Sequence, residues 1–400
     1  MTSKQMIVTL GLLMIISNIA LGIAPSLGVI GLSYPEVGRS TLQLIISLAA
    51  FASFGVSLVA GKLQDIFSQK IVVIIGALLL GSGSLPLFIQ PGFNFLLFIS
   101  VLLGLGAGLM TSTMPAIIAT YFSGDSRSNM LGLNTSLKAI GGMAVAALGG
   151  ILASFGWYFS YAMFLFAFVG VVFAIFFLPN DKAIRETQLL EEQESSGETS
   201  ADDNRLTLVS TTVIFVIILG MLVTLLGGVS QNNVALHIQE AHIGDAKVAG
   251  LALSCESLGG IAAGLIVTKL AKVFRSYTMI IGFIGMAVGQ LLIATIHLPM
   301  AVFIGCLVNG ISTWFVMTRI LFLMTSVVKP AAIPITAGVF SAATSLGFAL
   351  SPLIINQISG LFSDQLATTS FFVGVGIVVI LIVTLVITQF EQRLLKRIPE

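Results

Sequence analysis

Three ionisable side chains interrupt stretches that are otherwise almost wholly apolar: Lys138, Glu256 and Arg319. A carboxyl group can take up and release a proton, whereas a lysine or an arginine can bind an anion or pair with a carboxylate. Inside a bilayer each such group costs roughly 2.5–3.5 kcal/mol, so three cost about 9 kcal/mol, comparable with the stability of a whole domain. Groups this costly need partners or a water-filled cavity, and they are the first candidates for binding and coupling.

Amides and hydroxyls accompany these charges along the chain. At 100° per residue, Asn309, Ser312 and Arg319 fall within roughly 80° of one another, so they form one polar face of a helix. Interhelical hydrogen bonding is the alternative role for each amide. The candidate set for solute binding or coupling is Lys138, Glu256, Arg319, Asn18, Gln231, Asn232, Asn309 and Ser312, with Asn233 as a further amide.

No pattern typical of an enzyme occurs in the chain. Cys255 and Cys306 both fall inside apolar stretches, which favours small apolar fillers over a disulfide or a metal site. The glycine-rich stretches have apolar neighbours and no following Lys-Ser or Lys-Thr, so they do not predict a phosphate loop. A net charge of +1 without a basic run gives no reason to expect nucleic acid. We therefore expect no enzyme activity, no metal and no cofactor.

The composition shows which solvent surrounds these residues. Of the 400 residues, 56% are hydrophobic and 9% are charged. Such a chain cannot form a water-soluble surface, so the lipid bilayer must be its main solvent. Backbone that faces lipid must satisfy its own hydrogen bonds, and the apolar runs do not alternate in polarity, which favours helices over a barrel.

The sequence predicts an all-α membrane protein of twelve transmembrane helices, because uncharged runs of about 20 residues recur along the whole chain. The predicted spans are 6–30, 41–60, 71–89, 95–121, 130–154, 158–178, 208–237, 248–267, 278–296, 301–327, 335–358 and 368–390.

The distribution of lysine and arginine predicts the orientation of the spans. With an even number of spans, 14 of the 18 Lys and Arg residues lie on the side of the termini, and only Arg39 and Lys247 lie on the other. Because positive charge concentrates in cytoplasmic loops, both termini are expected in the cytoplasm of a cell membrane protein, in the plasma or inner membrane.

A polar stretch divides the chain almost in half. Residues 179–207 are rich in acidic residues and predict a cytoplasmic linker between two six-helix bundles, 1–178 and 208–390, with a tail at 391–400. The loops after the second and eighth spans share lysine, leucine and phenylalanine at an offset of 207 residues. This weak repeat favours two pseudo-symmetric halves.

The first of these loops carries a motif. Gly61, Leu63, Asp65 and Lys70 match a pattern of Gly, any residue, Leu, small residue, Asp, basic residue, any residue, Gly and two basic residues, although Ser68 and Gln69 depart from it. On this motif, the helix count and the repeat, the chain resembles the major facilitator superfamily over its full length. The resemblance implies a cytoplasmic gate at Gly61, Asp65 and Lys70, where the carboxylate can meet a helix N-terminus. It also implies two bundles that rock about a site near the bilayer midplane.

The depth of the three charges suggests how they could act. Each lies about eight residues, or roughly 12 Å, from the nearer end of its span, so their levels differ by only about 6 Å. In the fold that the resemblance implies, the fifth and eighth spans face each other and spans 1, 4, 7 and 10 line the cavity. We hypothesise that Glu256 pairs with Lys138 in one state and with Arg319, a proton or substrate in another. The alternatives are that Lys138 reaches the cytoplasmic interface, or that Arg319 and Glu256 form a static pair.

The excess of cations among the three charges favours an anionic solute. Proton-coupled drug exporters of the family usually carry an arginine and a Gly-Pro pair where this chain has Leu102 and Ala144-Val145. Met114-Pro115-Ala116 is loosely similar to organic-anion and cyanate-type members. The expected function is secondary transport of a small organic anion, proton-coupled or by exchange. Export of amphipathic drugs and a non-transporting membrane sensor are the alternatives.

Overall fold

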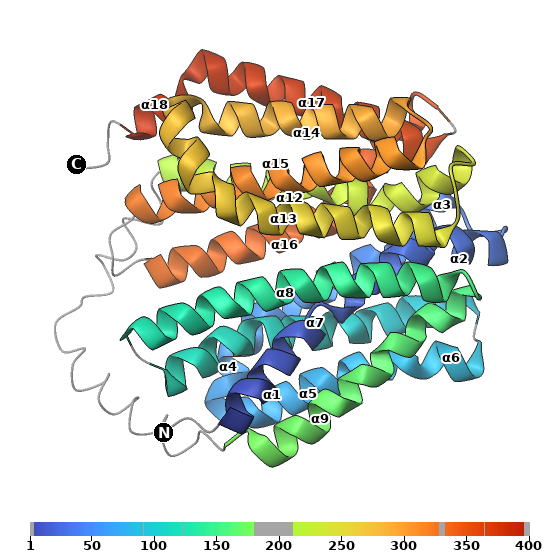
Figure 1. Ribbon diagram of the computed structural model, residues 1–400, viewed down its shortest axis with the longest axis vertical. Helices are drawn as coiled ribbons and strands as arrows, with labels where there is room; N and C mark the ends of the chain where they lie inside the picture. Colours follow the sequence, from blue (N-terminus) through green and yellow to red (C-terminus); the bar gives the residue numbers. More distant parts are fainter. Residues whose placement is uncertain are drawn as a thin grey trace.

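The computed structural model describes residues 4–90, 92–122, 124–179, 211–327, 333–363 and 365–395. Within them every regular element is a helix (Figure 1). The first group of elements is α1 (Lys4–Ile16), η1 (Ile19–Ser26), α2 (Leu27–Ser33), α3 (Arg39–Leu42), α4 (Leu44–Ile66), α5 (Gln69–Gly81), η2 (Ser82–Ser84), α6 (Leu85–Ile89), α7 (Phe93–Tyr121), α8 (Gly124–Ala153), η3 (Trp157–Phe164) and α9 (Leu165–Phe177). The second group is α12 (Thr211–Glu240), α13 (Ala246–Phe274), η4 (Arg275–Tyr277), α14 (Thr278–Thr295), α15 (Pro299–Val327), α16 (Ile333–Gly360), α17 (Leu366–Thr388) and α18 (Phe390–Leu395).

Each of the twelve predicted spans coincides with a helical segment. Eleven of these segments are long and apolar enough in their described residues to cross a membrane. The remaining one, α13, is a helix of 29 residues that carries Lys247 and Glu256. The structure is therefore the predicted all-α membrane protein, with ends that differ from the predicted ones by a few residues.

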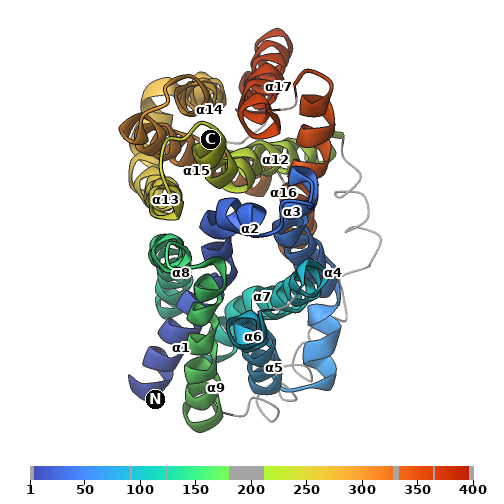
Figure 2. The same ribbon diagram turned by 90° about the vertical axis from the view of Figure 1, so that its right-hand side faces the viewer.

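The two groups of helices lie side by side. Figure 2, which looks along the helices, shows α1–α9 in one half of the molecule and α12–α18 in the other. The beginning of α1 and the end of α18 lie at the same end of the bundle (Figure 1); the opposite end, with α2, α3 and the end of α12, is called the far end below. The predicted linker, except Pro179, lies outside the described residues, as does the tail beyond residue 395.

Two helix pairs join the groups: α8 packs on α13, and α4 packs on α16. The first pair is the one that the family resemblance implied. Each pair combines the fifth span of one half with the second span of the other, as a duplicated unit requires. At the α8–α13 crossing, a Cβ added to Gly150 would lie 2.7 Å from the Cα of Gly250, so only small residues allow this approach.

The first span, predicted at residues 6–30, is one helical segment from Lys4 to Ser33, but it is not α-helical throughout. It changes to a 3-10 helix at Ile19, and this segment contains Gly22 and Pro25. Proline lacks the N–H that an α-helix needs and crowds the preceding turn. A Cβ added to Gly149 in α8 would clash with the carbonyl oxygen of Gly22, so no side chain would fit there. The break places Asn18 at the junction of two helical segments.

Candidate functional site

A cavity of about 180 Å³ lies among the first group of helices, and the second group contributes part of its wall. Among the described residues, the polar side chains that line it are all neutral: Ser17, Asn18, Ser53, Thr111 and Gln231. Two predicted site residues, Asn18 and Gln231, therefore meet here. Gln231 of α12 and Phe348 of α16 come from the second group, so the cavity spans the boundary between the halves.

Asn18 is held in place by a bond to α8. Its Nδ2 donates a hydrogen bond to the carbonyl oxygen of Lys138 at 3.0 Å. The backbone at Asn18 is not helical, with φ −105° and ψ 9°, so its side chain can reach both the cavity and α8. The helix break thus connects the cavity to the segment that carries the candidate lysine.

Lys138 lies on the face of α8 that turns toward the first span. Gly142, one turn further along, faces Leu21, Asn18 and Ser257, and residues i and i+4 share a helix face. The lysine side chain is half-buried. Among the described residues, no carboxylate lies within ion-pair distance of its Nζ. The lysine is thus beside the cavity wall but not among the lining residues.

Glu256 contacts neither Lys138 nor Arg319. Its Oε1 accepts hydrogen bonds from Ser230 Oγ at 2.6 Å and from Asn309 Nδ2 at 3.1 Å, and these two partners are 3.0 Å apart. All three side chains are buried. In this conformation the predicted pairing of Glu256 with Lys138 is absent, because α12 and α15 supply the carboxylate with neutral donors inside the second group.

Arg319 has a partner that the sequence analysis did not consider. Its Nε donates to Oε1 of Glu391 at 2.7 Å, and this carboxylate also accepts from the backbone N–H of Met279 at 3.0 Å, at the N-terminus of α14. Burial raises the pKa of Glu391 above its ordinary value, and the two hydrogen bonds offset part of the rise. Arg319 therefore forms a buried ion pair, as one alternative proposed, but its partner is Glu391 and not Glu256.

The predicted inward polar face of α15 is also divided. Asn309 joins Glu256, Ser312 faces Gly285 of α14, and Arg319 bonds α18. None of these three lines the cavity. The three side chains spread over roughly 80° around α15, so each can reach a different neighbouring helix. They therefore do not form one site, although they lie on the same side of the helix.

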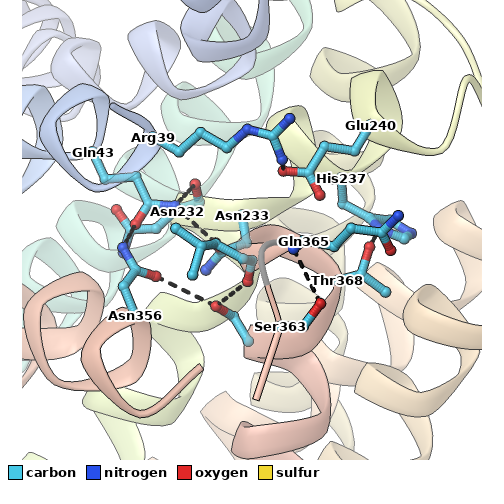
Figure 3. Close-up of polar contacts among 12 residues, drawn as sticks. Arg39, Gln43, Asn232, Asn233, His237, Glu240, Asn356, Ser363, Gln365 and Thr368 are labelled. Carbon is cyan, nitrogen blue, oxygen red and sulfur yellow. Dashed lines mark hydrogen bonds and ion pairs between the residues drawn. The ribbon is translucent and has the colours of Figure 1, made fainter. Parts of the chain in front are cut away.

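A network of buried amide side chains joins the two groups of helices toward the far end of the bundle (Figure 3). Gln43 Nε2 donates to Asn233 Oδ1 at 2.7 Å and to the carbonyl oxygen of Asn232 at 3.2 Å. Gln43 Oε1 accepts from Asn356 Nδ2 of α16, and Asn356 Oδ1 accepts from Ser370 Oγ of α17. Gln43 is only two residues from Ile45, which lines the cavity. The network therefore lies next to the cavity in the chain, although none of its side chains is among the lining residues.

The sequence analysis missed Gln43 and Asn356. The available signal was Gln43 in one mostly apolar span and the adjacent Asn356 and Gln357 in another. Such amides are also typical of ordinary interhelical bonds. It did identify Asn232, whose contribution is a backbone carbonyl. Beside the network, Arg39 and Glu240 form an ion pair between α3 and the end of α12.

The predicted gate near the termini is described only in part. The side chains at Gly61 and Asp65 lie outside what the structure describes. Lys70 Nζ donates to the carbonyl oxygen of Ile175 at 2.7 Å, near the C-terminus of α9, where a cation is favourable. This contact stays within the first group, so it does not link the halves.

The sequence resembles known proteins in its first half and over shorter stretches. A family model described as Major Facilitator Superfamily matches residues 5–234. A stretch of 173 residues is 24% identical to the hexuronate transporter of Bacillus subtilis (strain 168), covering 42% of this chain and 39% of that protein. A stretch of 138 residues is 28% identical to the D-xylose-proton symporter-like 1 of Arabidopsis thaliana, covering 34% of this chain and 27% of that protein. The chain thus spans less than half the length of these curated relatives.

Solved structures resemble the whole chain. A bacterial homolog of the human lysosomal transporter Spinster, in an inward-facing and unoccupied conformation, has a TM-score of 0.74 at 13% identity and covers 99% of this chain and 98% of its own. The nucleoside transporter NupG has a TM-score of 0.75 at 14% identity, with 96% and 99% covered. A D-xylose-proton symporter has a TM-score of 0.71 at 15% identity, with 99% and 97% covered. These likenesses concern the fold.

Proposed function

This chain belongs to the Major Facilitator Superfamily, and from that premise we propose that the solute it transports is a small hydroxylated organic anion. Members of this superfamily are multi-pass membrane transporters of small solutes and not enzymes, and we assign this chain the same general role. One observation carries the choice of solute: a lysine without a described carboxylate partner stands beside a cavity lined with amides and hydroxyls. A cation in a low-dielectric site attracts an anion strongly.

The lining of the cavity supports the hydroxylated part of the proposal. Asn18, Gln231, Ser53 and Thr111 offer donors and acceptors to hydroxyl groups, whereas the apolar side chains between them can cover ring carbons. A sugar acid combines both features in one molecule. The relative named as a hexuronate transporter is consistent with a solute of this class.

We further propose that the bundles 1–178 and 208–390 move as rigid bodies about the cavity, with both termini in the cytoplasm. The excess of Lys and Arg on the side of the termini supports this orientation. The far end is then the extracellular side, and the amide network of Gln43 must break for the cavity to open outward.

Counterflow in proteoliposomes tests the proposal. We expect glucuronate to exchange, and tetraphenylphosphonium, a hydrophobic cation, not to exchange. Lys138→Gln should raise the half-saturation concentration for glucuronate about 10- to 100-fold, because a hydrogen bond to a charged group contributes about 1.5–3 kcal/mol. Lys247→Gln is the matched control, since this lysine contacts Phe155 away from the cavity. Glucuronate exchange that is equal in both variants would refute the assigned role of Lys138.

A neutral hydroxylated solute is the second candidate, because the described residues that line the cavity itself include no charged side chain. Relatives and structures named for D-xylose and nucleosides fit that class. Xylose or uridine counterflow that is insensitive to Lys138→Gln would favour it over the anion.

A further inference from the structure

A second polar site lies inside the second group of helices, apart from the cavity. It consists of Glu256 of α13, Ser230 of α12 and Asn309 of α15, which are 5%, 0% and 0% exposed. None of the three is among the residues that line the solute cavity. We propose that these side chains bind one monovalent metal cation, Na⁺, which couples to solute movement.

The charge of the site calls for a cation. Burial disfavours the ionised form of Glu256, and the hydrogen bond from Ser230 offsets part of that cost. A buried carboxylate without a counter-charge costs several kcal/mol. Among the described residues no cationic side chain pairs with Glu256, and Arg319 of the same half bonds Glu391. A single carboxylate matches a single positive charge, so a divalent ion would leave the site with an uncompensated charge.

An unused acceptor atom points to the same ligand. Glu256 Oε2 is fully buried and has no hydrogen-bond partner among the described residues. Buried polar atoms are rarely left in this way unless a water or an ion completes them. One proton on Glu256 neutralises the charge, whereas a metal cation can be ligated by several oxygens at once.

The spacing of the three side chains suits an ion of this size. The nitrogen and oxygen of an amide are interchangeable by a flip of the group, so Asn309 can present its oxygen to the cluster. Three oxygens with separations of 2.6, 3.0 and 3.1 Å then form a triangle. Na⁺ has nearly the radius of Ca²⁺, whose oxygen ligands lie at about 2.3–2.6 Å; an ion at such distances sits about 1.7 Å above that triangle. Glu256 Oε2 is available as a fourth ligand.

The position of the site gives it a route to the boundary between the halves. Glu256 lies on α13, the helix that packs on α8, and Ser230 directly precedes Gln231, which lines the solute cavity. A cation that ties α12, α13 and α15 together would therefore fix the wall of the cavity. The coupling role rests on the proposed function, whereas the binding of the ion does not.

Thermal unfolding of the purified full chain, without solute, tests the binding. A ligand that binds only the folded state raises the melting temperature with its concentration. We expect Na⁺ to raise the Tm by a few degrees relative to choline, and K⁺ to raise it less. Glu256→Gln should abolish this shift. Ser230→Ala, a milder change, should raise the Na⁺ concentration for half of the shift about tenfold. Glu391→Gln removes another buried carboxylate of the same half and should keep the shift.

Two outcomes overturn the inference. The site binds only a proton if the Tm does not respond to Na⁺ but rises at low pH, and if Glu256→Gln removes that rise. A Na⁺ shift that survives Glu256→Gln places the ion elsewhere. The counterflow measurement does not depend on either result, so a failure of the ion site and a failure of the proposed solute are separate findings.

Discussion

Gln43 carries the contacts that hold the far end closed, so its removal is expected to open the cavity on that side. The side chain makes three hydrogen bonds across the two groups, with the carbonyl oxygen of Asn232, with Asn233 Oδ1 and with Asn356 Nδ2. Interhelical hydrogen bonds in membranes contribute about 0.6 kcal/mol on average, so three contribute about 1.8 kcal/mol. Gln43→Ala should thus shift the equilibrium toward the outward-open state by about 20-fold.

The assay is the rate at which a membrane-impermeant maleimide labels the cavity from outside intact cells. Ser53→Cys places the thiol in the cavity wall, in a background in which the two natural cysteines, Cys255 and Cys306, are replaced by alanine. When opening is fast, the labelling rate follows the open population, so Gln43→Ala should speed labelling about 20-fold.

A matched control is available in α5. Gln69 is also a buried glutamine, but it bonds Thr120 within the first group. Gln69→Ala should therefore leave the labelling rate unchanged. The reasoning fails if folded Gln43→Ala labels at the wild-type rate, or if both variants accelerate labelling equally.

Two further predictions concern stability. Removing one partner of a buried ion pair costs about 3–5 kcal/mol, so Arg319→Met and Glu391→Gln should each lower the Tm strongly. The Tm loss of the double variant should be much smaller than the sum of the two single losses. Additive losses in thermal unfolding would show that the pair is not coupled. Gly150→Ala should loosen the α8–α13 crossing, because the new Cβ would lie 2.7 Å from the Cα of Gly250. Gly55→Ala in α4, where nothing lies within 4 Å, should be neutral or stabilising by up to about 1 kcal/mol; equal Tm losses in both would show that the crossing does not require glycine.

The helices could be predicted from the sequence, because a run of apolar residues specifies a span without reference to any other part of the chain. The break at Ile19 is a local feature as well, and Gly22 with Pro25 was a signal for it that the sequence analysis did not use. Partners were harder to predict, since they depend on which helices meet. Arg319 and Glu391 are 72 positions apart, and the glutamate lies in a segment that had been assigned to a solvated tail.

The candidate site was predicted only in the parts that face the cavity directly. Asn18 and Gln231 were named from their type and span, and both line it. Lys138, Glu256 and Arg319 were grouped because they lie at similar depths, but depth does not fix the direction around a helix. Glu256 turns to Ser230 and Asn309, and Arg319 turns to Glu391. Similar depth was therefore insufficient to predict a switch among the three charges.

Four consecutive residues of α12 link the features that the structure places apart. Ser230 bonds Glu256, Gln231 lines the cavity, the carbonyl oxygen of Asn232 accepts from Gln43, and the side chain of Asn233 accepts from it as well. Successive helical residues point 100° apart, so four of them reach neighbours in nearly every direction around the helix. The proposed solute at Gln231 and the proposed cation at Ser230 would thus act on the same helical turn that bonds Gln43. Since neighbouring residues of one turn share its backbone hydrogen bonds, we expect occupancy of either site to change the geometry that Gln43 requires, which would provide a physical route from binding to gating.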